Sequence, residues 1–409
     1  MHRVDTGDTA WVLMATALVM LMTPGLGLFY GGMVRRKNVL ATMLQSFILI
    51  GIVGVQWVLF GYSLSFGPDR WHIIGSLEWA GLRHVGLAPN TVYSATVPHQ
   101  AFMIFQLMFA VITPALITGA FAERIRFKSF LIFTLLWVTL VYDPVCHWIW
   151  APGGWLRELG ALDFAGGTVV HICSGIAALA CALVVGRRRG YGKEDMTPHN
   201  VTMTVVGAAL LWFGWFGFNA GSALAANTLA FSAFVATNTA AASAALSWTF
   251  IEWWHRGKPT ALGAASGSVA GLVAITPGSG YVGPIAAIVI GTAVSAFCYF
   301  AIMMKSSLGY DDALDVFGIH GVGGAWGALA TGVFASAAIN SAGVDGLLGG
   351  NPGLVTKQVI AILAVIAYSF GVTIIILKLM GAFSDLRVTH EQEESGLDVS
   401  QHGEVGYSF

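Results

Sequence analysis

The chain has 409 residues, of which 56% are hydrophobic and 10% are charged. Soluble domains carry about 25% charged residues, so this composition excludes a soluble globular protein and indicates an all-α polytopic membrane protein. Its net charge of −1, with basic residues confined to short loops, excludes a nucleic-acid partner.

Eleven hydrophobic segments are long enough to cross about 30 Å of hydrocarbon as transmembrane helices. The first of them exceeds the apolar core of a secretory signal, so we expect it to remain as a membrane helix. In chain order the segments lie near residues 10–34, 39–66, 98–121, 129–150, 163–186, 199–220, 229–255, 261–277, 281–304, 313–335 and 356–381.

The loops that carry lysine and arginine alternate along the chain. After the odd-numbered segments, up to the ninth, lie Arg35, Arg36, Lys37, Arg124, Arg126, Lys128, Arg187, Arg188, Arg189, Lys193, Arg256, Lys258 and Lys305. The opposite side holds Arg3, Arg70, Arg83, Arg157 and Lys357. Because basic loops stay in the cytoplasm during insertion, this bias predicts an N-terminus outside and a C-terminus inside.

The segments divide into two sets of five, from about 10–186 and about 199–335. An odd number of helices per set predicts that the two repeats are inverted relative to each other. A weak internal similarity between PGLGLFYGG and FGWFGFNAG agrees with this. The eleventh helix, about 356–381, stands outside the repeats and completes a membrane domain of residues 1–381, which leaves 382–409 as a cytoplasmic tail.

Two histidines, His171 and His320, lie inside apolar segments, where ionisable groups are costly and mark functional sites. Counted from Asp163 and Asp311 at the helix rise, both lie about 12 to 13 Å into the membrane, near its midplane. If the imidazoles meet, at least one is neutral, and the pair passes a proton or hydrogen bond along a narrow path. Separate packing roles remain the alternative, whereas two histidines alone supply too few ligands for a metal site.

Aromatic residues gather toward the outer ends of the third, fourth and sixth segments. A membrane-interface belt or core packing accounts for most residues of this kind. The alternative is a cation site, because aromatic faces attract a small cation, and Ser222 in NAGSA would add a hydroxyl acceptor. The residues are Phe105, Phe109, Trp148, Trp150, Trp215, Phe216 and Phe218.

Seven motifs follow one another along almost the whole chain. They are FxxxF at Phe105 and Phe109, FAERIRF at 121–127, DFAGGTVVH at 163–171, GWFGFNAGSA at 214–223, RGKP at 256–259, DVFGIHGVGG at 315–324 and GLDVSQHGE at 396–404. Together they resemble the ammonium transporter (Amt/Mep/Rh) family, specifically its microbial transporters. The resemblance implies a homotrimer in the plasma membrane that transports ammonium, with methylammonium as an analogue. It implies neither an enzymatic activity nor a cofactor.

The resemblance also implies roles for the outer residues. Trp150, Ser222 and Phe109 would recruit ammonium, and Phe109 with Phe218 would form a stacked hydrophobic gate beneath them. Asp163 would shape this site and its local potential without touching the substrate. Its alternative role is that of a residue that caps the start of the fifth helix.

Below the gate, His171 and His320 would be the twin histidines that line the pore. Stripping a proton from ammonium removes most of the cost of crossing an apolar constriction, an option that potassium lacks. Ammonia would then pass alone, or together with a separately transferred proton. We favour the second, electrogenic route.

The acidic tail, 382–409, has by itself the composition of a disordered end. The resemblance implies instead a structured segment on the face where microbial members bind a PII-type signal protein. Asp315, Lys193 and Asp398 would belong to this regulatory face.

Three rivals to a transporter are an ammonium sensor that signals through its tail, an intramembrane enzyme and a passive gas channel for ammonia or carbon dioxide. An enzyme would need a nucleophile or a fuller metal shell. The tryptophan and serine of the outer site argue against the gas channel. Two local departures from the family pattern, Asp143 beside Pro144 and the extra Trp155, concern the outer vestibule.

Overall fold

A computed structural model describes residues 4–408 of the chain, which are predominantly helical. A short antiparallel hairpin, β1 (Asp69–Arg70) with β2 (Ile74–Gly75), pairs Asp69 with Gly75. The α-helices are α1 (Thr6–Met33), α2 (Val39–Gln56), α3 (Tyr62–Phe66), α4 (His99–Ile117), α5 (Phe127–Trp137), α6 (Asp143–Trp150), α7 (Trp155–Leu159), α8 (Cys173–Val185), α9 (Val201–Gly221), α10 (Thr228–Arg256), α11 (Ala261–Ile275), α12 (Pro284–Leu308), α13 (Gly323–Phe334), α14 (Pro352–Phe383), α15 (His390–Ser395) and α16 (Leu397–His402).

Nine helical segments within residues 4–408 are long and apolar enough to cross a membrane. They are Thr6–Met33, Arg36–Phe66, His99–Ala120, Phe127–Leu159, Gly167–Val185, Val201–Gly221, Thr228–Arg256, Pro284–Leu308 and Pro352–Phe383. The other two predicted segments are also helical, as the 15-residue α11 and as a π-helical turn, Phe317–Val322, that continues into α13. The prediction of a helical, multi-pass membrane protein is therefore confirmed.

Capping residues explain where the first and last of these helices differ from their predicted bounds. The first begins at Thr6 rather than 10, because the Asp5 side chain accepts from the Asp8 N–H and caps its first turn. The last runs from Pro352 to Phe383 rather than over 356–381, and Pro352 occupies the first helical turn, where a missing N–H costs nothing.

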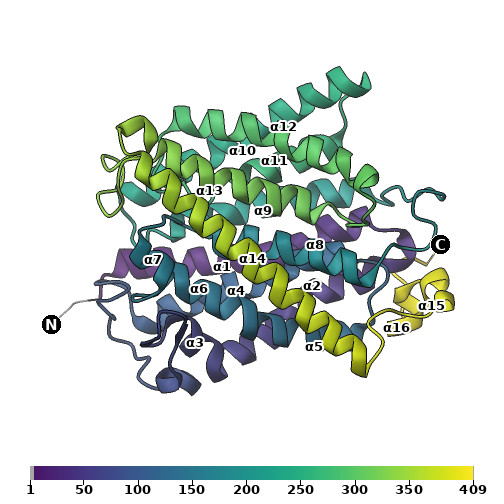
Figure 1. Cartoon of the computed structure of the whole chain (residues 1–409), viewed down its shortest axis with the longest axis horizontal. Coiled ribbons are helices and arrows are strands. Elements are labelled where there is room, and N and C mark those ends of the chain that lie inside the picture. Colours follow the sequence, from purple (N-terminus) through teal and green to yellow (C-terminus); the bar gives the residue numbers. More distant parts are fainter. Residues whose placement is uncertain (1–3, 409) are drawn as a thin grey trace.

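Most of the helices lie roughly side by side, and the long α14 crosses them obliquely (Figure 1). Close packing between helices depends on glycine, and two of these contacts bear on the site. A Cβ at Gly207 of α9 would lie 2.3 Å from the Phe29 nitrogen of α1, and one at Gly175 of α8 would lie 2.1 Å from the Gly321 nitrogen. Neither contact admits a side chain, so α8 and the turn that contains His320 meet backbone to backbone.

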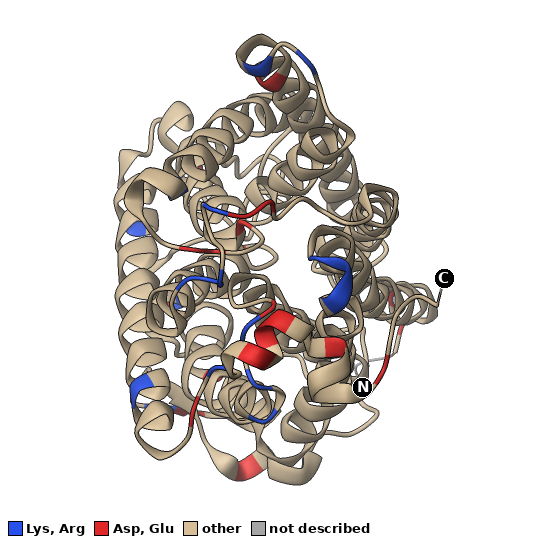
Figure 2. Cartoon of the chain, turned by 90° about the vertical axis from the view of Figure 1, so that its right-hand side faces the viewer, with Lys and Arg blue, Asp and Glu red and all other residues tan. Residues whose placement is uncertain are grey.

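We call the end of the molecule where α15 and α16 lie the tail end (Figure 1). Charged segments gather there around the loops between helices (Figure 2). Ion pairs join these loops to one another and to the tail, namely Arg35–Glu123, Arg188–Asp311, Arg189–Glu394 and Arg126–Asp385, and Arg387–Glu393 lies within the tail. The loops after the first, third, fifth and ninth predicted segments therefore meet at one end. Arg3, assigned to the opposite side, lies outside the described residues.

The tail is folded rather than disordered. Thr389 and Gln392 form a capping box at the start of α15. The Asp398 carboxylate accepts from the backbone N–H groups of Leu40 (3.1 Å) and Ala41 (2.8 Å). It therefore caps the start of α2, although more than 350 residues separate it from that helix in the sequence. The structured tail implied by the family resemblance is therefore what the structure contains.

Candidate functional site

A row of rings leads from the end opposite the tail into the centre of the bundle. The Trp150 and Phe109 ring centroids lie 5.6 Å apart at 88°, and those of Phe109 and Phe218 lie 4.3 Å apart at 33°. The Phe218 ring is next to His171 at 6.1 Å, and His171 is next to His320 at 5.3 Å. Residues more than 200 positions apart in the chain thus form one continuous sequence of contacts.

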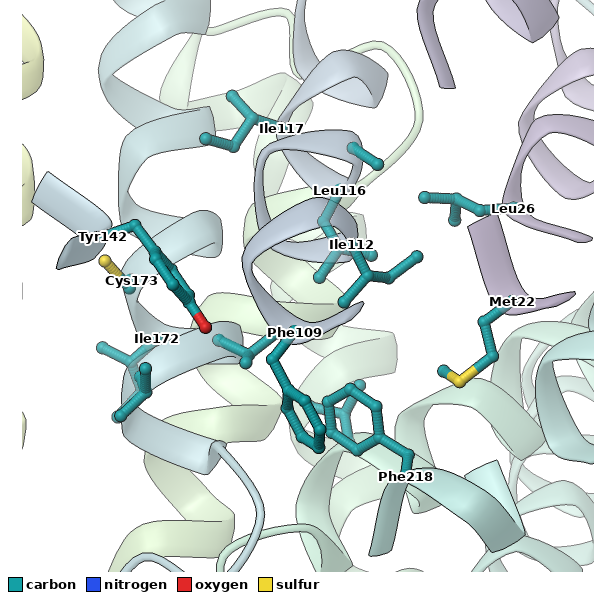
Figure 3. Close-up of a cluster of buried hydrophobic side chains, with 14 of the residues drawn as sticks. Met22, Leu26, Phe109, Ile112, Leu116, Ile117, Tyr142, Ile172, Cys173 and Phe218 are labelled. Carbon is teal, nitrogen blue, oxygen red and sulfur yellow. The ribbon is translucent and has the colours of Figure 1, made fainter. Parts of the chain in front are cut away.

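The two phenylalanines close this route. Phe109 comes from α4 and Phe218 from α9, both are buried, and Figure 3 shows their rings side by side, with Met22, Leu26 and Ile112 near them. All of these side chains are apolar except for the soft sulfur of Met22. An ion crossing here would lose its water without receiving a polar partner, which makes the stacked pair a barrier to charge.

The two histidine side chains meet through their Nδ1 atoms, 3.3 Å apart. His171 is 1% exposed and His320 3% exposed. One Nδ1 donates and the other accepts, so at least one ring is neutral. The Nε2 atom of His171 is buried and has no hydrogen-bond partner among the described residues, so it is available to a small polar ligand.

A narrow cavity of about 10 Å³ is lined by Phe218 and by both histidines. This volume is at the lower limit for one water molecule. Apart from the imidazoles and the Trp215 ring, its walls are apolar: Met22, Leu26, Phe29, Ile112, Leu116, Val170, Leu211, Phe218 and Val269.

Both histidines lie in π-helical turns, Gly167–Ile172 and Phe317–Val322. Turns of this kind widen a helix locally and occur frequently at functional sites. The Asp163 carboxylate holds the start of the first turn by accepting from four backbone N–H groups, those of Gly166, Gly167, Thr168 and Val169, at 2.7 to 3.2 Å. Asp163 therefore makes the contacts of a residue that caps the start of this helix, which was the alternative role considered for it.

The outer residues are held by backbone contacts. The Trp150 indole N–H donates to the Asp163 carbonyl at 2.9 Å, and the Arg157 guanidinium donates to the Trp150 carbonyl. Ser222 ends α9, and its hydroxyl donates to the Phe218 carbonyl at 2.8 Å. Because that bond uses the only proton of the hydroxyl, its oxygen remains available as an acceptor for a cation.

The three residues assigned to a regulatory face lie at the tail end in different settings. Lys193 is exposed, and Asp315 pairs with Lys305. Asp398 is 3% exposed and is engaged by α2. Lys193 is therefore accessible, Asp315 is half-buried in an ion pair, and Asp398 fastens the tail.

The structure adds contacts of buried side chains that the sequence did not predict. The Trp215 ring stacks on His171 at 5.3 Å and 24°, and its N–H donates to Thr276. Asp143, an unexpected charge in the sequence, accepts from Gln56 at 2.8 Å and Ser65 at 3.1 Å in a buried cluster. A further residue, Asp312, precedes His320 by eight residues, as Asp163 precedes His171. This spacing in the sequence could have revealed Asp312.

Comparison with known proteins identifies the family. The model of the "Ammonium Transporter Family" matches residues 10–407. A Bacillus subtilis protein named "Ammonium transporter" is 54% identical over 402 residues, which are 98% of each chain. The crystal structure of Saccharomyces cerevisiae Mep2 aligns with a TM-score of 0.89 and 39% identity over 95% of this chain and 89% of that one. A structure titled "Sensor Amt Protein" aligns with a TM-score of 0.89 and 31% identity over 97% and 98%. The chain belongs to the ammonium transporter family.

Proposed function

We propose that this protein transports ammonium across the plasma membrane through a pore within each subunit. Trp150, Ser222 and Phe109 recruit the cation, Phe109 and Phe218 gate the route, and His171 with His320 lines it. The observation that carries the proposal is the unbroken row of contacts from Trp150 through both phenylalanines to the paired imidazoles.

Charge is lost before the constriction. An unpaired cation has no polar partner between the stacked phenylalanines, whereas neutral ammonia lacks most of that desolvation cost. Potassium cannot shed its charge, so it is rejected at the same barrier. The ammonia lone pair then accepts from an imidazole N–H, and its own N–H groups donate to a neutral imidazole nitrogen.

Water at the outer site accepts the proton that ammonium releases, and this proton then crosses separately by way of the histidine pair, which makes transport electrogenic. The Nδ1–Nδ1 contact of 3.3 Å supports this step, since a proton given to one ring displaces the proton shared with the other. The pair then resets when the imidazoles rotate or exchange protons with water. Neither ring holds a permanent charge in the low-dielectric centre.

The wider architecture belongs to the same proposal. The chain crosses the membrane as eleven helices, of which ten form two inverted repeats of five and the eleventh belongs to neither repeat. The N-terminus lies outside the cell, and the tail end lies in the cytoplasm. Three subunits assemble, each with its own pore. A PII-type signal protein binds the tail end through Lys193 and Asp315.

A sensor is the second candidate function. Its support is the likeness to the structure titled "Sensor Amt Protein" together with a folded tail that is tied to several loops. A sensor would bind ammonium without sustained flux. A passive gas channel would show flux without dependence on ammonium recruitment.

Methylammonium uptake into proteoliposomes tests the proposal. We expect uptake by the wild type and a loss of at least tenfold in His171→Ala and His320→Ala, each of which removes one partner of the pair. His255→Ala is the matched control, because this histidine hydrogen-bonds Tyr299 at 2.7 Å, away from the row of rings. Wild-type protein that binds methylammonium without accumulating it would favour the sensor, and undiminished uptake by both pore variants would refute the role of the pair.

A further inference from the structure

Each pore histidine follows an aspartate by eight residues, His171 after Asp163 and His320 after Asp312. Both aspartates hold the start of the π-helical turn that contains the histidine. Asp163 does so near Trp150, and Asp312 does so at the tail end, where its Oδ2 accepts from the Phe317 N–H at 2.7 Å. The two carboxylates therefore occupy corresponding positions at the two ends of the route.

Their hydrogen bonding differs. Both oxygens of Asp163 are saturated, each by two backbone donors. The Oδ1 atom of Asp312 is buried and has no hydrogen-bond partner among the described residues, although the residue is only 1% exposed. A proton can therefore bind to Asp312 without displacing a donor, whereas Asp163 has no unoccupied acceptor site.

The charges around Asp312 do not neutralise it. The Lys305 ammonium donates to the backbone carbonyl of Asp312 at 2.7 Å, but it forms its ion pair with the carboxylate of Asp315. Arg188 pairs with Asp311, and Arg124 is engaged by backbone carbonyls. The titratable or charged groups that face it are Lys305 from α12, Tyr30 from α1, Cys181 from α8, Arg124 after α4, and Tyr310 and Asp315 from its own loop.

This setting makes Asp312 titratable near neutral pH. Burial raises the pKa of its carboxyl group to about 6, with Lys305 lowering it and Asp315 raising it. The ionised carboxylate accepts a charge-assisted hydrogen bond from the Phe317 N–H. The partial positive charge at the start of the following helix also stabilises it. The protonated acid makes only a neutral bond of about half that strength.

We propose that Asp312 is a positioning residue through which the pH on the tail side sets the transport rate. When ionised, it holds the turn that contains His320 against His171. When protonated, it loosens the turn and slows transport. The inference rests on the proposed function and on the proposed orientation, and it assigns acid inhibition to one carboxyl group.

Inside-out membrane vesicles, whose tail side faces the bath, test this assignment through methylammonium flux. For a group that titrates near pH 6, the ionised fraction falls about tenfold between pH 7 and pH 5. We expect wild-type flux to fall by a similar factor, and flux through Asp312→Asn to be low at pH 7 and to change less than twofold. Asp385→Asn is the matched control, because Asp385 also lies at the tail end but pairs with Arg126 at 3.0 Å, apart from the charges that face Asp312, and it should keep the wild-type step. A full step in Asp312→Asn, or its loss in Asp385→Asn, would overturn the proposal.

Infrared difference spectroscopy provides a readout that needs neither transport nor a foldable variant. Between pH 5 and pH 7 the wild type should lose the carbonyl band of a buried carboxylic acid. A wild-type spectrum without this band overturns the proposal. Absence of wild-type flux at both pH values contradicts the proposed function instead, and the infrared titration still decides the state of Asp312.

Discussion

Adding a single methyl group at Gly175 should separate the two pore histidines. A Cβ there would lie 2.1 Å from the Gly321 nitrogen and 2.5 Å from its Cα, against about 3.4 Å for an ordinary contact. Both neighbours are backbone atoms and cannot rotate away, so α8 and the π-helical turn must move apart by about 1.3 Å. Taken up along the line between the rings, this shift stretches the 3.3 Å Nδ1–Nδ1 contact to about 4.6 Å, beyond hydrogen-bond reach.

The fold should survive this change while transport does not. Overpacking costs about 1 to 3 kcal/mol, and replacing glycine with alanine in a helix returns up to about 1 kcal/mol. Loss of one hydrogen bond worth about 1.4 kcal/mol in the rate-limiting step corresponds to a roughly tenfold slower rate. We therefore expect Gly175→Ala to lower methylammonium uptake about tenfold, with only a modest fall in the thermal unfolding temperature.

Gly371→Ala in α14 is the matched control, because a Cβ there meets no atom within 4 Å. It should leave uptake unchanged. Uptake at the wild-type rate by a folded Gly175→Ala protein would show that the close contact of the two histidines is not needed, and would refute the reasoning.

Three further substitutions test the outer site, the gate and the tail. Trp150→Phe keeps an aromatic face but loses the bond to the Asp163 carbonyl, worth about 1 kcal/mol, so the methylammonium concentration for half-maximal uptake should rise roughly fivefold; an unchanged value would argue against recruitment there. Phe218→Ala removes one ring of the gate, so pH-sensitive dye in liposomes should report a proton leak absent from the wild type, and thermal unfolding should show a loss of about 3 to 5 kcal/mol; a tight, fully stable variant would exclude the gating role. Asp398→Ala removes the remote cap of α2, worth about 1 kcal/mol, so limited proteolysis should cut the tail after α14 faster than in the wild type, and equal rates would mean that other contacts fasten it.

The helices were predictable because a membrane span is a long apolar run, which local sequence reports directly. His171 and His320 were predictable for a related reason, since an ionisable side chain inside such a run is costly and therefore conspicuous. Their π-helical turns were not predictable, because a run of apolar residues does not report where a helix widens, and the two turns meet across about 150 residues of chain.

Polar partnerships across the fold were also beyond local sequence. The stacking of Trp215 on His171 and the link from Asp398 to α2 join distant segments, and no periodicity reports them. Asp312 is an intermediate case. Its spacing to His320 was present in the sequence, but Asp311 and Asp315 stand beside it, and only the structure shows which of the three caps the turn.

The central claim is that charge is removed from the substrate before it crosses the constriction. The most direct test compares currents evoked by ammonium and by potassium in proteoliposomes at equal concentrations, with the wild type beside the double variant His171→Ala/His320→Ala. The account predicts an ammonium current, no potassium current, and loss of the ammonium current in the double variant. A wild-type potassium current comparable to that of ammonium would contradict it, because potassium crosses only as an intact ion.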